Sequence, residues 1–372
     1  MSRSFQLTLI VFLAIFTVLG LITALARPAT PQMTPICSSI MTPHLEAKIS
    51  PGENLIYCAS FQLAWNQLQD RIIRAPIQLS GNPRDAAILN CQQIKEDALP
   101  AGAYLAKAGQ LTQDFLTALN RELKNKFGPN APPEVKEPNA RGAFLAYAYL
   151  YKAMTFPREF EALEEPIIFS APDDNHIPVE GFGINRCHRN SDHQQLRQQV
   201  KVYDYRNEND FILTMAGRDQ EDVLVLAKVK PCATLLKTIQ TVEARIKKSA
   251  KNPTSLQEDE TLQIPKIFLE MDVAYPQLQG LQILNKGWEG SRIAKARQWL
   301  RFKLDQKGAS VKSEARIIIV RGALRPVRNY IFDRPFLLYL KKQGHSLPYL
   351  ALWLETPAWF RVTGQQDNKN QP

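Results

Sequence analysis

The chain has 372 residues, of which 45% are hydrophobic and 22% are charged. That composition is typical of a folded globular protein and excludes a disordered chain, and the length allows one large domain or two ordinary ones. Lysine and arginine number 46 against 36 aspartate and glutamate, a net charge of +10, but the basic residues are dispersed, so we expect solubility rather than nucleic-acid binding.

The first 26 residues are typical of an export signal. Arg3 precedes an uncharged apolar run over residues 5–22, which ends in Ala-Leu-Ala at 24–26. A positive start, an apolar centre and a small-x-small ending predict a secretory signal peptide over residues 1–26. The apolar run is also long enough to span a membrane, so an uncleaved N-terminal anchor stays open. Either way we expect export to the periplasm or the cell exterior.

Cysteine and histidine usage gives no metal site. In an exported chain an odd number of cysteines allows up to two disulfides and one leftover thiol, and buried unbridged cysteines are the alternative. Cys187, His188 and His193 lie close together, but no second ligand pair accompanies them, so we predict no metal and no cofactor. Five cysteines are spread through the sequence without a CxxC pair: Cys37, Cys58, Cys91, Cys187 and Cys232.

Most of the chain is predicted to form one domain. Residues 27–51 are rich in proline and threonine and lack periodicity, which predicts a linker. Periodic apolar patterns then continue through residues 52–362, and residues 363–372 form a polar tail.

Helical patterns dominate the first half of this domain. Apolar residues recur at helical spacing from Phe61 to Leu68 and again over residues 101–123. Residues 143–152 are apolar on both faces, as in a central strand of a sheet. Later runs predict a helix at 235–246 and strands at 200–205, 211–215 and 223–229.

The last quarter of the chain combines several elements in a distinctive order. A strand near Phe302 ends in a turn at 305–308, after which come a segment at 309–317 and a basic stretch at 321–328. An Arg-Pro-Phe block at 334–336 then opens two apolar runs separated by a polar turn. This succession resembles the C-terminal third of a serpin, in which a glycine-containing hinge opens a long reactive loop.

The resemblance extends in order from Asn54 to Trp353. An Asn-aliphatic-aromatic block at 54–57 precedes the first buried helix, and Ile-Pro-Lys-Ile at 264–267 is similar to a Leu-Pro-Lys-Phe strand of the family, which is followed by a helix near Leu278. The resemblance implies an α+β fold, with mixed β-sheets packed with a helical N-terminal half. It also implies a divergent serpin-like protein of bacterial type, which is not an enzyme and which we expect to be a monomer.

The segment after Gly308 has two unlike faces when it is extended. The resemblance implies that it is a hinge whose small face becomes buried when a cleaved loop inserts into a sheet. Burying that face would bury no charge. The β-branched run at 317–320 would instead suit a permanent strand, and both interpretations stay open. The hinge residues are Gly308, Ala309, Val311, Ser313 and Ala315.

Counting from the hinge as the family does places the scissile bond within residues 321–324. Arg321 before Gly322 would suit a trypsin-like serine protease, whose carboxylate pairs with arginine, and Leu324 would suit an apolar pocket. We favour Arg321. The expected function is therefore a serine endopeptidase inhibitor that acts as a suicide substrate through residues 308–328.

Two departures from the family support other functions. Tyr147 stands where the family has asparagine in the central strand, and Gln298 stands where it has histidine. Replacing buried polar groups by apolar ones can stabilise a closed sheet. A non-inhibitory scaffold that binds a partner, with the loop held as a fixed strand, is therefore the alternative, and a substrate that is cleaved without trapping the protease is a third.

One basic stretch offers a further partner. It is helix-like in the sequence and could bind a polyanion, as in some serpins, or it could be a solvated face. Its residues are Arg292, Lys295, Arg297, Arg301 and Lys303.

Overall fold

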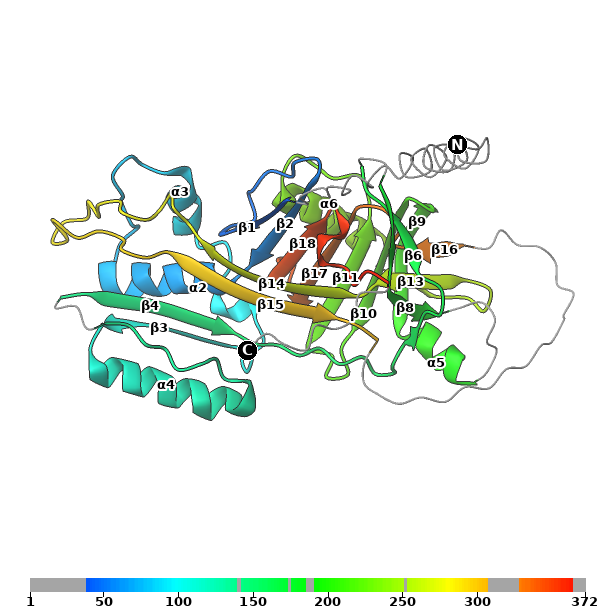
Figure 1. Cartoon of the computed structure of the whole chain (residues 1–372), viewed down its shortest axis with the longest axis horizontal. Helices are drawn as coiled ribbons and strands as arrows, with labels where there is room; N and C mark the ends of the chain where they lie inside the picture. The colour runs from blue at the N-terminus through cyan, green and yellow to red at the C-terminus, as the bar shows by residue number, and fades with distance from the viewer. Residues whose placement is uncertain are drawn as a thin grey trace, which may run out of the picture. The chain divides into compact units, whose positions relative to one another are not determined.

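An eight-stranded sheet forms the centre of the described chain (Figure 1). The computed structural model describes residues 38–138, 142–172, 175–184, 191–250, 253–306 and 328–363. All neighbouring strands of this sheet are antiparallel except β1 and β2, which are parallel. In spatial order the strands are β1 (Ser38–Thr42), β2 (Glu53–Cys58), β18 (Leu350–Leu354), β17 (Phe336–Lys342), β11 (Asp222–Lys228), β10 (Asp210–Ala216), β9 (Val200–Asn207) and β12 (Thr254–Ser255).

The middle strands of this sheet are buried on both faces. Every residue of β18 and the first five of β17 are buried, which is why their sequences lack the alternation of a half-exposed strand. Helix α6 (Leu235–Ser249) packs against the sheet, and its Glu243 accepts hydrogen bonds from Tyr339 and Lys341 of β17. Thr234 caps this helix by accepting a hydrogen bond from the Lys237 amide.

A second sheet has four strands, which come from both halves of the chain. It contains β16 (Asn329–Ile331), β13 (Thr261–Pro265), β8 (Gly181–Ile184) and β5 (Glu161–Ala162). The backbones of β8 and β13 approach closely at Gly183. A Cβ at this position would lie 1.8 Å from the Leu262 carbonyl oxygen, so the position requires glycine. The hairpin β6 (Ile167–Ser170) and β7 (His176–Val179) and the helix α5 (Ser191–Gln198) complete this region.

Two separate two-stranded ribbons make up the rest of the strands. One pairs β3 (Tyr104–Gln110) with β4 (Phe144–Leu150), and the other pairs β14 (Ile267–Ala274) with β15 (Arg297–Leu304). Figure 1 shows α2 (Ser60–Gln67) next to the first ribbon and α4 (Gln113–Phe127) along its other side. Leu119, Leu123 and Phe127 of α4 pack against side chains of β3 and β4.

The remaining helical segments are short. Helix α2 continues into the π-helix η2 (Leu68–Ile73), which ends at Arg74 in the left-handed conformation. Among the described residues no helix combines the length and the apolar character needed to cross a membrane. The other segments are α3 (Arg84–Asn90), η3 (Glu96–Ala98), η4 (Gly128–Asn130) and η5 (Pro357–Trp359).

Three sequence-based predictions differ from the structure. The linker predicted over 27–51 contains β1, and Met41 and Leu45 are buried in the core, because this stretch supplies the edge strand beside β2. The helix predicted over 101–123 begins with β3, and only α4 is helical, because pairing with β4 outweighs helical spacing. The helix expected near Leu278 is absent from 275–296, where Gly280, Gly287 and Gly290 have positive φ.

The strand predictions in the second half are confirmed. Strands β9, β10 and β11 and helix α6 lie at the predicted places, with ends within a few residues. The predicted signal or anchor at 1–26 lies outside the described residues, as does all of the tail except residue 363.

Candidate functional site

Each of the two ribbons leaves the outer edge of both its strands without a partner strand in the described part of the chain, and the two strands that concern the site are β4 and β15. Strand β4 is hydrogen-bonded to β3, and β15 to β14, but no ladder joins β4 to β15. The run at 143–152 is a strand as predicted, yet it is paired on one side and not on two. Unpaired edges present backbone N–H and C=O groups that another strand can bind.

The predicted reactive segment follows one of these edges directly. Strand β15 ends at Leu304, and the chain enters β16 at Asn329. The segment therefore connects β15, whose outer edge has no ladder in the described residues, to the four-stranded sheet. Its predicted hinge and cleavage residues lie outside the described residues: Gly308, Ala309, Val311, Ser313, Ala315, Arg321, Gly322 and Leu324.

A buried polar network links β15 to the start of α2. The Gln298 side chain is 5% exposed, and its Nε2 donates to the Cys58 carbonyl and to the Ser60 Oγ, each at 2.9 Å. The Tyr275 hydroxyl donates to Gln298 Oε1 at 2.5 Å. Burial raises the pKa of Tyr275, so this hydroxyl stays a donor at neutral pH. Gln298 is thus a buried, hydrogen-bonded polar residue in the strand that precedes the predicted hinge.

Tyr147 does not join this network. It packs in the cluster of α4, whereas its neighbour Ala148 packs against the main core. Because successive side chains of a strand point to opposite faces, a shift of one residue changes the face completely. The structure therefore does not bring Tyr147 and Gln298 together, and Ala148 faces the core from this part of β4.

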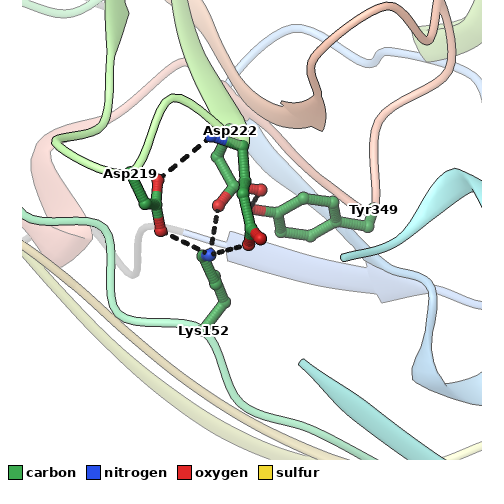
Figure 2. A network of polar contacts seen from close by, with 5 residues as sticks. Lys152, Asp219, Asp222 and Tyr349 are labelled. Carbon is green, nitrogen blue, oxygen red and sulfur yellow. Dashed lines mark hydrogen bonds and ion pairs between the residues drawn. The ribbon is translucent and has the colours of Figure 1, made fainter. Parts of the chain in front are cut away.

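A charged cluster lies where the chain leaves β4 (Figure 2). The Lys152 ammonium is 2.9 Å from Asp219, 3.1 Å from Glu221 and 2.7 Å from Asp222. Asp222 is fully buried and also accepts a hydrogen bond from the Tyr349 hydroxyl at 2.9 Å. We call these five residues the Lys152 cluster.

Burial and pairing act against each other in the Lys152 cluster. Burial raises the pKa of Asp222, although Lys152 and Tyr349 act to lower it. Burial acts to lower the pKa of Lys152, but its three carboxylates outweigh that effect and the pKa is raised. The carboxylates lie close enough together to hold a metal ion, but the Lys152 ammonium takes the central position. The sequence signal was three acids within residues 219–222, and sequence reasoning missed it.

A second ion pair, whose lysine is buried, lies just after β16. Lys228 of β11 is 3% exposed, and its Nζ donates to Asp333 Oδ1 at 2.5 Å and to the Ile331 carbonyl at 3.1 Å. Burial lowers the pKa of Lys228 despite the opposing effect of Asp333. This pair joins the end of β16 to the eight-stranded sheet.

The basic stretch predicted as helix-like forms strand β15 and the loop before it. Four of its five cations pair with neighbouring acids: Arg297 pairs with Asp272 at 2.8 Å, Arg301 with Glu270 at 3.6 Å and Lys303 with Asp305 at 2.6 Å. Lys295 similarly pairs with Glu137 at 2.7 Å. Ion pairs of this kind are typical of a solvated face, and binding of a polyanion stays a prediction.

Three of the cysteines can be placed. Cys58 is buried, Cys91 is exposed and Cys232 is intermediate, and all three are free thiols. Burial raises the pKa of the Cys58 thiol. Cys37, Cys187 and His188 lie outside the described residues.

Comparison with known proteins identifies the fold. No profile of a known protein family and no curated protein sequence matches this chain. The crystal structure of maspin is similar over 82% of this chain and 92% of its own, with 10% identity and a TM-score of 0.50. A thyroxine-binding globulin complex with thyroxine covers 82% and 93% at 11% identity (TM-score 0.48), and a serpin from Schistosoma mansoni covers 66% and 64% at 14% identity (TM-score 0.39).

The chain therefore has a serpin-like α+β fold. The likeness to maspin confirms the fold that the resemblance implied. At this level of identity it concerns the fold alone.

Proposed function

We propose that this chain inhibits an exported serine endopeptidase as a suicide substrate through residues 308–328, with a trypsin-like enzyme as the favoured target. The observation that carries the proposal is the pair of unpaired edges on β4 and β15, together with a segment that leaves β15 directly. A strand placed between the two edges would gain hydrogen bonds on both sides. The small face of the segment would be buried without burying a charge.

The chemistry begins as ordinary proteolysis. The protease serine attacks the Arg321 carbonyl carbon, the Arg321–Gly322 peptide bond breaks, and an ester to the serine oxygen forms. The Gly322 amine leaves with a proton that the protease histidine delivers. Inhibition requires that the segment enters the sheet before water hydrolyses this ester.

The length of the cleaved segment is sufficient for insertion. Cleavage after Arg321 leaves fourteen residues, 308–321, attached to the β15 side. Strand β15 has eight residues and β4 has seven. The cleaved segment can therefore run along the full length of both edges.

The second candidate is a non-inhibitory scaffold in which the segment is a fixed strand. The four β-branched residues at 317–320 favour it, because such a run is unfavourable in water. A fixed strand would resist cleavage within 321–324.

The first experiment separates these functions. The chain from residue 27 onward is incubated with trypsin and with chymotrypsin and then boiled in detergent for electrophoresis. Inhibition predicts a band at the summed mass, lost with trypsin in Arg321→Ala if Arg321 is the site and with chymotrypsin in Leu324→Ala if Leu324 is. A clean cut with a fully active protease overturns inhibition, and no cut favours the fixed strand.

Two matched variants test insertion itself. Val311→Arg places a charge on the face that would be buried, and Ser310→Arg places the same charge on the opposite face. We expect Val311→Arg to be cut without forming the stable band and Ser310→Arg to behave as the parent chain. Equal behaviour of the two variants would contradict insertion of this face.

A further inference from the structure

The C-terminal end of β4 is attached to the eight-stranded sheet. The Tyr151 amide donates to the Ala103 carbonyl at 2.8 Å, and the next residue is Lys152. The Lys152 side chain is 12% exposed and reaches the three carboxylates that lie between β10 and the start of β11. A backbone bond of 2.8 Å from the Arg218 amide to the Thr155 carbonyl adds a second connection.

The other side of this attachment is rigid. Asp222 is the first residue of β11 and lies opposite Lys342 of β17 in the antiparallel ladder. Its side chain is fully buried and accepts the hydrogen bond from Tyr349, next to the start of β18. Figure 2 shows Lys152 pointing to Asp219 and Asp222 from a separate segment of the chain. A displacement of the β4 end must therefore break an ion pair in a site of low exposure.

The unpaired edges create a tendency that this attachment opposes. Strands β4 and β15 each have backbone groups that a direct β4–β15 ladder would satisfy. Forming that ladder requires β4 to move toward β15. Movement of the β4 end is limited by the Lys152 cluster, because separating Lys152 from a buried Asp222 leaves an uncompensated buried charge.

We propose that the Lys152 cluster is a positioning device that keeps β4 apart from β15 and so leaves the place between them open to another strand. That the cleaved segment enters this place rests on the proposed function. That the cluster holds β4 in its position rests on the Lys152 contacts alone. The Lys152 cluster controls whether a strand can insert between β4 and β15, although none of its residues belongs to the segment that is cleaved.

The test needs a variant that removes the ion pair without leaving one charge behind. Lys152→Met combined with Asp222→Asn does this, since the side-chain amide that replaces the carboxylate still offers an oxygen to the Tyr349 hydroxyl. A matched control is Lys341→Met combined with Glu243→Gln. Lys341 and Glu243 are 2.7 Å apart, and the Lys341 side chain is 12% exposed, as is that of Lys152. Glu243 also accepts a tyrosine hydroxyl, and the two residues belong to β17 and α6.

Hydrogen exchange with mass spectrometry is the first measurement, on uncleaved protein. In the Lys152→Met and Asp222→Asn variant we expect amides of 144–150 and 297–304 to exchange at least tenfold more slowly, because β4 and β15 pair. We expect amides of 152–155 to exchange faster. The control should change neither region. Unchanged exchange at β4 and β15, or faster exchange there, would overturn the inference.

The stable protease complex gives the second measurement. If the parent chain forms the complex, the Lys152→Met and Asp222→Asn variant should form at least fivefold less, with the protease released active, while the control forms as much as the parent. An equal yield in both variants would overturn the device as a determinant of entry. If the parent chain forms no complex, the proposed function fails, and the exchange result still decides the geometry.

Discussion

The strands of the eight-stranded sheet and of the two ribbons have similar apolar sequences, but they differ in burial and in the number of partner strands. Strands β17 and β18 have a partner on each side and are almost wholly buried. Strand β4 is nearly as apolar, yet among the described residues it has one partner strand, and its side chains are half-buried or exposed. Apolar residues on both faces show that a strand is covered above and below. They do not show that both of its edges are bonded.

The largest difference should appear when equivalent leucines are truncated. Leu338 of β17 is fully buried between Leu226 and Leu352, so Leu338→Ala should lower the free energy of unfolding by about 4 kcal/mol. Leu150→Ala in β4 should cost about 1–2 kcal/mol, because its surroundings are partly open. Urea unfolding of both variants measures the two free-energy losses. Equal losses would show that β4 is packed as tightly as the central sheet.

Breaking the ion pair that joins β16 to the central sheet should have the next largest effect on the free energy of unfolding. Asp333→Ala leaves the Lys228 ammonium buried without its carboxylate and should cost about 3 kcal/mol. Adding Lys228→Met to that variant should recover a large part of the loss, since no buried charge is then unpaired. Thermal unfolding of the two single variants and the double variant forms the cycle. Additive losses would mean that the two side chains act independently.

The ribbon of β3 and β4 should lose stability at alkaline pH. Burial raises the pKa of Tyr147 to about 12, from a usual value near 10. Because the folded pKa is raised, this stability is fully present below pH 10 and is lost as the pH rises from about 10 to 12. Two pH units correspond to about 2–3 kcal/mol.

A tyrosine-to-phenylalanine variant isolates that contribution. Tyr147→Phe has no proton to lose, so its free energy of unfolding should fall less between pH 9 and 12 than that of the parent chain. Tyr203→Phe, on β9, serves as the comparison. The pH profile from urea unfolding decides the matter, and the same slope for the parent chain and Tyr147→Phe would contradict it.

The sequence allowed the fold to be predicted well where local pattern and pairing agree. Strands β9, β10 and β11 and helix α6 follow from their own residues, and the order of motifs from Asn54 to Trp353 indicated the serpin-like fold. Residues 104–110 show the limit, because their strand depends on β4, which lies more than thirty residues later.

The candidate site was only partly predictable for the same reason. Gln298 could be assigned from its place in the family pattern, and the structure places it in a buried network. The Lys152 cluster joins residues nearly two hundred positions apart, from Lys152 to Tyr349. No spacing in the sequence indicates that contact, since it arises when β10, β11 and β18 assemble.

The outer face of the second ribbon should show the smallest effect. Arg301 pairs with Glu270 at 3.6 Å, with both side chains about half exposed, and its guanidinium lies 5.4 Å from the centre of the Phe268 ring. Exposed pairs of this kind contribute less than about 1 kcal/mol each. Arg301→Gln should therefore change the free energy of unfolding by less than about 1 kcal/mol in urea.

The same variant tests the polyanion interpretation of this face. If the acids on β14 neutralise the row of cations on β15, Arg301→Gln should elute from heparin-agarose at nearly the same salt concentration as the parent chain, and as Lys248→Gln on α6. A clear drop for Arg301→Gln alone would mean that the cations of β15 bind the polymer despite their acidic partners. The ribbon would then offer a binding face as well as an open edge.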